Sequence, residues 1–177
     1  MIHLIGIDVS PDLLGGLAAQ LAPIFHMACQ VRLERLDVAF ARDRLRNQYY
    51  STAILQAMQP FAEPGARLLA VASMDLYVPV LTFVFGEAQL SGNCAVVSLH
   101  RLRDEFYGLP VREDLMRERL VKEAVHELGH TFGLQHCDDW RCVMTSSHGV
   151  ERVDVKGTDF CTLCGRVVVG ARTPVLV

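Results

Sequence analysis

Three histidines and one glutamate stand close together near the end of the chain, as His126, Glu127, His130 and His136. Residues four positions apart on a helix point in nearly the same direction, so the imidazoles of His126 and His130 can reach one point. Gly133 can end such a helix in the left-handed region, and the reversed chain then brings His136 back to that point. Three neutral imidazoles that leave a fourth position open are the ligand set of a catalytic zinc ion.

Glu127 directly follows the first of these histidines and therefore cannot point with them toward a metal. It can instead reach a water molecule at the open position and take its proton, which is the role of a general base. Structural zinc sites are closed by four protein ligands and favour cysteine, unlike three histidines beside an acid. The alternative of ordinary helix-end residues fits poorly, because the full HExxHxxGxxH spacing is far more specific than HExxH alone. The pattern predicts hydrolysis by an activated water.

Four of the six cysteines form two short-range pairs after the histidines, Cys137 with Cys142 and Cys161 with Cys164. Two thiolate pairs at such spacings are typical of a closed, tetrahedral zinc site. His136 and Cys137 are adjacent, and neighbouring side chains of an extended segment point in opposite directions, so each can face a different metal. The alternatives are reduced core cysteines or two disulfides.

Met144 lies in the loop that follows the third histidine, where the chain must pass back beneath the metal. An apolar, flexible side chain there would support the histidines without binding the ion. The isolated Cys29 and Cys94 stand in strand-like sequence and are interpreted as core residues. Four further histidines have no partner at ligand spacing and are interpreted as ordinary residues: His3, His26, His100 and His148.

The composition is that of a packed, soluble protein of one domain. The 177 residues are 51% hydrophobic and 21% charged, enough to bury a core without help from disulfides or partner chains. The net charge of -3, with interspersed basic residues, gives no sign of nucleic-acid binding. The N-terminus lacks the basic flank and cleavage site of a signal peptide, and no apolar run is long enough for a membrane span. We therefore expect a cytoplasmic monomer whose cysteines stay reduced or bind metal.

The elements that must position these residues alternate between strands and helices. We expect strands at residues 2–9, 29–40, 66–79, 80–89 and 94–102, and helices at 10–25, 41–60 and 112–132. Ser10 and Pro11 are typical of a helix start, and Pro60 ends the second helix. The turn-rich residues 90–93 predict a hairpin, which makes at least one strand antiparallel. The segment after His136 has little periodicity and is expected to be a loop.

These elements predict an α/β (or α+β) fold in a single domain over residues 1–177. Its twisted sheet of about five strands should be mixed and mostly parallel, with an antiparallel edge strand. Helices should pack against the sheet, among them the active-site helix at 112–132. No linker, repeat or low-complexity run divides the chain, so the zinc-binding part from about residue 126 belongs to the same domain.

Together with Met144, the HExxHxxGxxH pattern resembles the metzincin clan of zinc peptidases. A cysteine directly after the third histidine, a CxM sequence and a distant CxxC are similar to the archaemetzincin family within that clan. The resemblance implies a metzincin-like catalytic domain and a zinc metallopeptidase with two zinc ions per chain. One ion would lie on the three spaced histidines with Glu127 as base, and the other on the four paired cysteines. The segment from Met144 to the CxxC is one residue shorter than in that family, which a loop tolerates.

The resemblance also implies features of the substrate. It would be a peptide or protein, and aminopeptidase-like trimming is associated with the family. Its extended backbone would pair with the edge strand just before the active-site helix, around residues 95–98. In some metzincins a tyrosine beyond the methionine approaches the metal, but no tyrosine follows Met144 here. A rival interpretation is a non-proteolytic zinc protein that binds peptides or partners, although a binder has no need of Glu127. A weaker third interpretation is zinc buffering by the thiolates.

Overall fold

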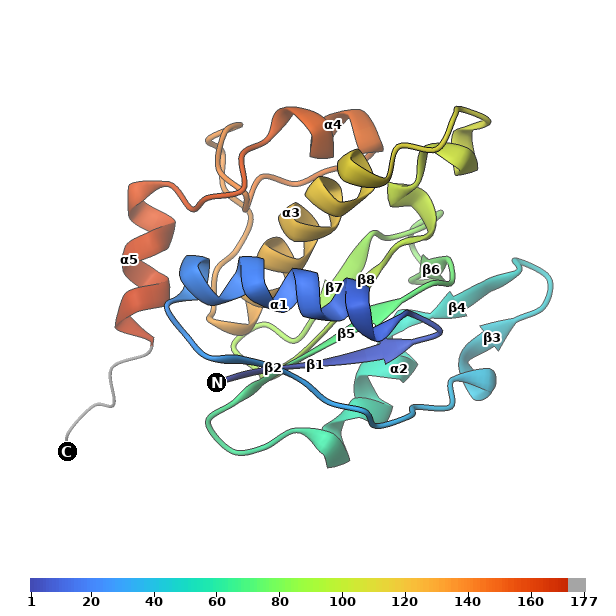
Figure 1. Cartoon of the computed structure of the whole chain (residues 1–177), viewed down its shortest axis with the longest axis horizontal. Coiled ribbons are helices and arrows are strands. Elements are labelled where there is room, and N and C mark those ends of the chain that lie inside the picture. Colours follow the sequence, from blue (N-terminus) through green and yellow to red (C-terminus); the bar gives the residue numbers. More distant parts are fainter. Residues whose placement is uncertain (172–177) are drawn as a thin grey trace.

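The computed structural model describes residues 1–171, whose central feature is a five-stranded sheet (Figure 1). Its strands lie in the order β2 (Cys29–Val31), β1 (Ile2–Ile7), β5 (Arg67–Ala72), β8 (Cys94–Ser98) and β7 (Gly86–Ala88). The first four run parallel to one another, and β7 runs antiparallel to β8 at the edge. The predicted α/β fold, with a mostly parallel sheet and one antiparallel edge strand, is confirmed.

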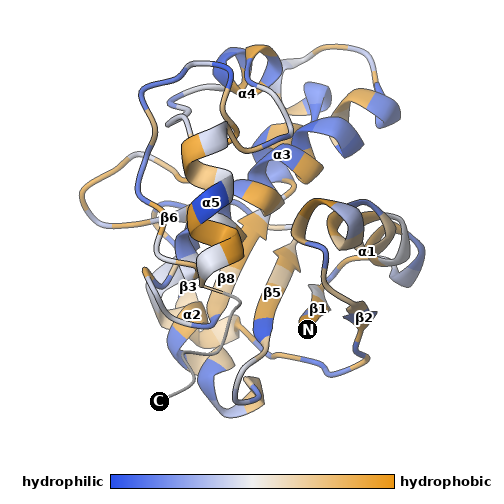
Figure 2. Cartoon of the chain, turned by 90° about the vertical axis from the view of Figure 1, so that its left-hand side faces the viewer, coloured by the Kyte–Doolittle hydropathy of each residue, from blue (hydrophilic) through white to orange (hydrophobic). Residues whose placement is uncertain are grey.

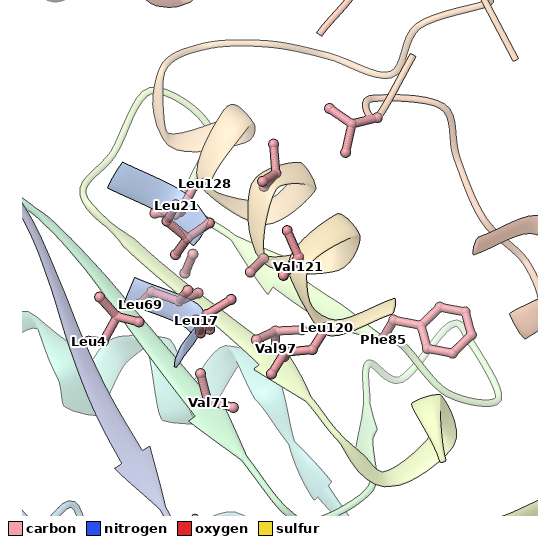
Figure 3. Packing of buried hydrophobic residues seen from close by; sticks show 14 of the residues in the cluster. Leu4, Leu17, Leu21, Leu69, Val71, Phe85, Val97, Leu120, Val121 and Leu128 are labelled. Atoms are coloured by element: carbon pink, nitrogen blue, oxygen red, sulfur yellow. The ribbon is translucent and has the colours of Figure 1, made fainter. Parts of the chain in front are cut away.

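Helices cover both faces of this sheet. On one face lie α1 (Pro11–Phe25) and α3 (Glu113–Thr131), and on the other lies the shorter α2 (Ser51–Met58) (Figure 1). Side chains alternate along a strand, so Leu69 of β5 packs in the core with α1 and α3 while Leu68 packs in the core with α2. Figure 3 shows leucines and valines of α1 and α3 packed over β1, β5 and β8, and these central strands are predominantly hydrophobic in Figure 2. Within residues 1–171, no helix combines the length and apolar character needed to cross a membrane.

The first strand and helix form as the sequence predicts. Ser10 caps α1, because its Oγ atom accepts a hydrogen bond from the Leu13 N–H at 3.4 Å, and Pro11 takes the first helical position. The helix ends at His26, whose φ of 46° lies in the left-handed region. The chain then returns to pair β2 in parallel with β1, as a strand-helix-strand crossover does.

The predicted helix at 41–60 is wrong in its first half. A hairpin precedes α2, formed by β3 (Arg42–Asp43) and β4 (Gln48–Tyr50). The Asp43 carboxylate stabilises its turn by accepting hydrogen bonds from the N–H groups of Leu45 and Arg46 at 2.9 and 3.1 Å. β4 then pairs in parallel with β6 (Leu76–Tyr77), which completes a second, three-stranded sheet. Turn chemistry and strand pairing therefore override the helical spacing of this segment.

Several predicted strands are shorter than expected because only part of each finds a partner. Residues 29–40 contribute only β2, and residues 66–79 divide into β5 and β6. Residues 80–89 contribute only β7. Residues 78–85, here called the strap, form turns and bends with one bridge from Val84 to Leu76. Short 3-10 helices lie at Ala39–Ala41, Gln59–Phe61, His100–Leu102 and Asp104–Tyr107. The alternation of apolar residues in a sequence indicates which side chains are buried, but it does not indicate whether the backbone pairs with another strand.

The segment after His136 contains helices, contrary to the prediction of a loop. They are α4 (Val150–Val155) and α5 (Thr162–Gly170). At six and nine residues they are too short to show a clear helical period. α4 is held against α3 by the Arg119 guanidinium, which donates to both carboxylate oxygens of Asp154 at 2.6 and 2.8 Å.

Candidate metal centres and catalytic cleft

α3 and the turn that follows it bring three histidines to one point. His126 and His130 lie one helical turn apart near the end of α3, with their Nε2 atoms 3.1 Å from each other. Gly133, with a φ of 90°, takes the left-handed conformation after the helix, and His136 follows. One nitrogen from each of the three histidines lies within 4.8 Å of the others. We call these three residues the histidine cluster.

Backbone carbonyls orient the two imidazoles of α3. The Nδ1 atom of His126 lies 2.9 Å from the Val143 carbonyl oxygen, and that of His130 lies 2.7 Å from the Leu134 carbonyl oxygen. An Nδ1–H that donates to a carbonyl leaves the Nε2 lone pair free for a metal. Burial lowers the pKa of His126 well below its ordinary value, and it also lowers the pKa of His130 and that of His136. Their neutral form, which binds metal, is therefore favoured.

Glu127 is buried beside the histidine cluster and lines the same cleft. Burial raises the pKa of its carboxyl group well above the ordinary value, and repulsion from Glu123 adds to this shift. A cation held by the histidines would oppose the shift. The Glu127 side chain passes close to β7 at Gly86, where a Cβ atom would lie 2.5 Å from Glu127 Cγ and 2.6 Å from the Val96 carbonyl oxygen. Only glycine leaves room for this arrangement.

The four paired cysteines also converge, and we call Cys137, Cys142, Cys161 and Cys164 the cysteine cluster. Their Sγ atoms lie within 4.8 Å of one another, and all four are free thiols. A hydrogen bond from the Cys164 N–H lowers the pKa of the Cys161 thiol to about 7. Burial raises the pKa of Cys142 and that of Cys164. Four convergent thiols are the donor set of a closed zinc site.

Met144 lies between the two clusters. The Cys137 N–H donates to the Met144 carbonyl oxygen at 3.0 Å. The Met144 side chain is fully buried against α3, where a Cβ atom on Gly129 would lie 2.5 Å from its Sδ atom. The methionine therefore packs against the helical turn that separates His126 from His130, and Gly129 makes the close approach possible.

The other cysteines and most of the other histidines lie apart from both clusters. Cys29 is half-buried on β2, and Cys94 is buried on β8, where burial raises its pKa to about 11. His3 lies 3.3 Å from the Glu63 carboxylate. His148 belongs to neither cluster, as the sequence predicts, although it lines the same cleft as the histidine cluster.

The histidine cluster opens into a cleft of about 820 Å³. Besides the cluster and Glu127, its lining includes β7, most of the strap, and residues 146–148 that follow Met144. β7 is the free edge of the sheet, whereas β8 lies between β5 and β7 and is buried throughout. The expectation that residues 95–98 form the edge strand is therefore wrong. In the hairpin of β7 and β8, β7 lies at the edge of the sheet although it comes first in the sequence. The free backbone edge in the cleft therefore belongs to residues 86–88.

Comparison with known families identifies the chain. A family model described as peptidase family M54 matches residues 42–169, a span that includes the active-site helix and both clusters. The chain belongs to peptidase family M54, the archaemetzincins. Membership of the archaemetzincins makes it a metallopeptidase, a hydrolase of peptide bonds.

Archaemetzincins from several archaea resemble the chain over most of its length. The archaemetzincin of Methanocaldococcus jannaschii is 42% identical over 158 residues, which are 89% of this chain and 86% of that protein. The crystal structure of archaemetzincin from Archaeoglobus fulgidus, complexed with malonate, matches with a TM-score of 0.81 and 38% identity, over 94% of this chain and 98% of that one. A zinc-dependent peptidase from Methanocorpusculum labreanum matches with a TM-score of 0.83 and 29% identity, over 95% of this chain and 100% of that one.

Proposed function

We propose that this chain is a zinc-dependent peptidase in which the histidine cluster holds the catalytic ion and Glu127 is the general base. The observation that carries the proposal is the convergence of three imidazole nitrogens within 4.8 Å, beside a buried carboxylate and in one cleft. Among residues 1–171, no other histidine, and no cysteine, aspartate or glutamate, joins this group as a fourth ligand. Three neutral nitrogen donors therefore fit a zinc site that keeps one position for water.

The chemistry divides between the ion and Glu127. Bound zinc would supply positive charge that lowers the pKa of a water and polarises the substrate carbonyl. Glu127 lies beside the histidines, where it can take a proton from a water in the cleft and return it to the leaving amine. Its close approach to β7 at Gly86 restricts the carboxylate to this region, so it needs little reorganisation during the reaction.

The cysteine cluster would hold a second, structural zinc ion, which makes two ions per chain. Four thiols within 4.8 Å fit a closed tetrahedral site with no position left for substrate. Cys137 and Cys142 bracket the loop before Met144, and Cys161 and Cys164 lie at the start of α5. The ion would therefore join α5 to the loop beneath the histidine cluster.

The substrate would be a peptide or protein bound along β7. Residues 86–88 line the cleft and pair with β8 on one side only, so their outer backbone groups are available to an extended peptide. We further propose that the chain acts as a monomer with one catalytic domain over residues 1–177. One of the two core clusters has members from β1 through α5, and the same central strands contribute to the other, which supports the assignment of one domain.

Cleavage of a diverse peptide library, read by mass spectrometry, tests this function. The proteins compared are the zinc-loaded wild type, Glu127→Gln, and Glu113→Gln as a matched control at the exposed far end of α3. Wild type and Glu113→Gln should cleave peptides, whereas Glu127→Gln should retain two zinc ions and lose roughly 100-fold or more in kcat. Full activity of Glu127→Gln would refute the role of the base. A wild type that binds two ions but cleaves nothing would favour a binding protein, and the positions of cuts distinguish an aminopeptidase from an endopeptidase.

A further inference from the structure

The strap forms an apolar wall of the cleft. Leu81 and Phe83 belong to its lining, and Leu81 is 51% exposed although it borders the site. Val80, its neighbour, is 88% exposed and does not line the cleft. Apolar surface left open inside a binding cleft is the kind of surface that a ligand covers. The strap thus presents an apolar surface to whatever lies beside the histidine cluster.

Polar side chains from the hairpin of β3 and β4 hold the strap in place. Arg46 donates from one Nη2 atom to the carbonyl oxygens of Leu81 and Thr82, at 2.8 and 3.0 Å. The Gln48 amide donates to the same Thr82 carbonyl oxygen at 3.0 Å. These bonds satisfy backbone groups that have no partner strand, so the strap is fixed even though it makes few ladder hydrogen bonds.

The aromatic part of the wall is fixed by a partly buried ion pair. Arg101 donates to both carboxylate oxygens of Asp75, each at 2.8 Å, and its guanidinium lies 4.1 Å from the centroid of the Phe83 ring. Phe83 also packs edge-on against Phe85, with ring centroids 5.2 Å apart. A guanidinium held bidentately offers a flat, immobile surface for an aromatic ring. Phe83 is therefore preorganised before any substrate arrives.

Away from the histidine cluster, which would hold a cation, the acidic side chains of the cleft lining have no basic counterparts within the part of it that the structure describes. Among residues 1–171, its lining includes three glutamates but no lysine or arginine. Glu87 accepts hydrogen bonds from the hydroxyl groups of Ser51 and Thr52, and Glu123 is paired with Lys156. An acidic substrate side chain beside the strap would find no lysine or arginine among the described residues of the lining to pair with, and Glu87 would oppose it.

We propose that the strap sets the specificity of the peptidase by selecting substrates with a bulky aliphatic or aromatic side chain beside the scissile bond and rejecting acidic ones. The inference rests on the proposed peptidase function. When a substrate side chain covers Leu81 and Phe83, the apolar surfaces of both are removed from water, which favours binding. Because the strap is already fixed, it loses little conformational freedom on binding. Arg46 is a positioning residue, because it acts on the substrate only through the strap.

The experiment uses a peptide that wild type cleaves and a set of derivatives with Leu, Phe, Ser or Asp at one position beside the cut. Wild type should prefer Leu and Phe over Ser, and should cleave the Asp peptide least. Leu81→Ser should lower the ratio of kcat/KM for the Leu peptide over the Ser peptide by about 10-fold. Val80→Ser is the matched control on the same strap and should leave the ratio unchanged. An unchanged ratio in Leu81→Ser, or a wild-type preference for Asp, would overturn the inference.

Arg46→Ala tests the positioning role, with Arg44→Ala in the same turn as control. Arg46→Ala should raise KM for the Leu peptide while kcat stays within about twofold, because Arg46 itself does not line the cleft that holds Glu127. Equal KM values in the two variants would remove Arg46 from the proposal. Equilibrium binding of the same peptides to zinc-loaded Glu127→Gln, with and without Leu81→Ser, tests the strap separately from catalysis. Binding without an apolar preference contradicts the inference even if the peptidase function fails.

Discussion

Lys156 and Glu123 form an ion pair of 2.7 Å inside the protein, with 0% and 4% of their side chains exposed. Glu123 lies one helical turn before Glu127 on α3. Lys156 Nζ also donates to the Thr145 carbonyl oxygen at 3.3 Å. The pair therefore connects the helix that carries the histidine cluster with the loop that begins at Met144.

Replacing only Lys156 should be strongly destabilising. Lys156→Met leaves the Glu123 carboxylate buried without its partner, and we expect the free energy of unfolding to fall by about 3–5 kcal/mol. Urea unfolding followed by circular dichroism measures the change. The double variant Lys156→Met with Glu123→Leu removes both charges and should recover much of the loss. A single variant that loses less than about 1 kcal/mol would mean that the pair contributes no more than a surface pair does.

Adding one methyl group to β7 should impair catalysis. In Gly86→Ala the new Cβ atom meets Glu127 Cγ and the Val96 carbonyl oxygen, so the carboxylate must move. A displacement of about 1 Å can cost on the order of 100-fold in rate, and we expect kcat to fall while both zinc ions stay bound. Steady-state kinetics and metal analysis of one preparation measure both quantities. Gly15→Ala is the control, since its Cβ atom would have no neighbour within 4 Å. Normal activity in Gly86→Ala would contradict the proposed position of the general base Glu127.

Asp104 should contribute stability that depends on pH. Its carboxylate accepts hydrogen bonds from Arg112 and from Arg119, which lower its pKa in the folded protein. A folded-state pKa below the unfolded value adds stability above the unfolded pKa, about 3.9, and this stability is lost as the pH falls toward the folded pKa. Asp104→Asn should therefore be less stable than wild type at pH 7, and the difference should shrink below about pH 4. The free energies of unfolding of wild type and Asp104→Asn, measured from pH 7 to below about pH 4, test this prediction. A stability difference between the two proteins that does not change with pH would contradict it.

The cysteine cluster should be needed for the fold of the C-terminal part. Cys161→Ser removes one of four thiols, and we expect one zinc ion per chain instead of two, together with a lower melting temperature or aggregation. Cys29→Ser is the matched control, because Cys29 lies outside the cluster. Metal analysis and thermal unfolding of both variants provide the comparison. A stable Cys161→Ser protein that still binds two ions would refute a structural site.

Local spacing explains why the convergence of the histidine cluster could be predicted from the sequence. His126 and His130 share one helix, and Gly133 turns the chain within three residues of His136, so their convergence depends on short-range geometry alone. The parallel sheet could be predicted for a similar reason, because dense apolar runs separated by helices favour that pairing.

Residues that meet across the sheet could not be predicted in this way. Gly86 contacts Glu127 only because β7 lies at the sheet edge below α3, and nothing in the local sequence fixes that position. Lys156 looks like an ordinary surface residue until α4 places it against Glu123. The hairpin of β3 and β4 shows the same limit, since apolar spacing favoured a helix while the Asp43 turn and the pairing with β6 decide the structure.

The peptide bond between His136 and Cys137 joins the two clusters directly, and this has a consequence for chain entropy. An ion on four thiolates would cross-link residues 137–164 and so remove conformational freedom from the unfolded chain. His136 would then be restrained on both sides, by α3 before it and by the cross-link after it. Opening of the cross-link would release the third histidine by local unfolding while the central sheet stays folded. The position of His136 in the histidine cluster would thus depend on an ion, bound by the cysteine cluster, that has no contact with the substrate.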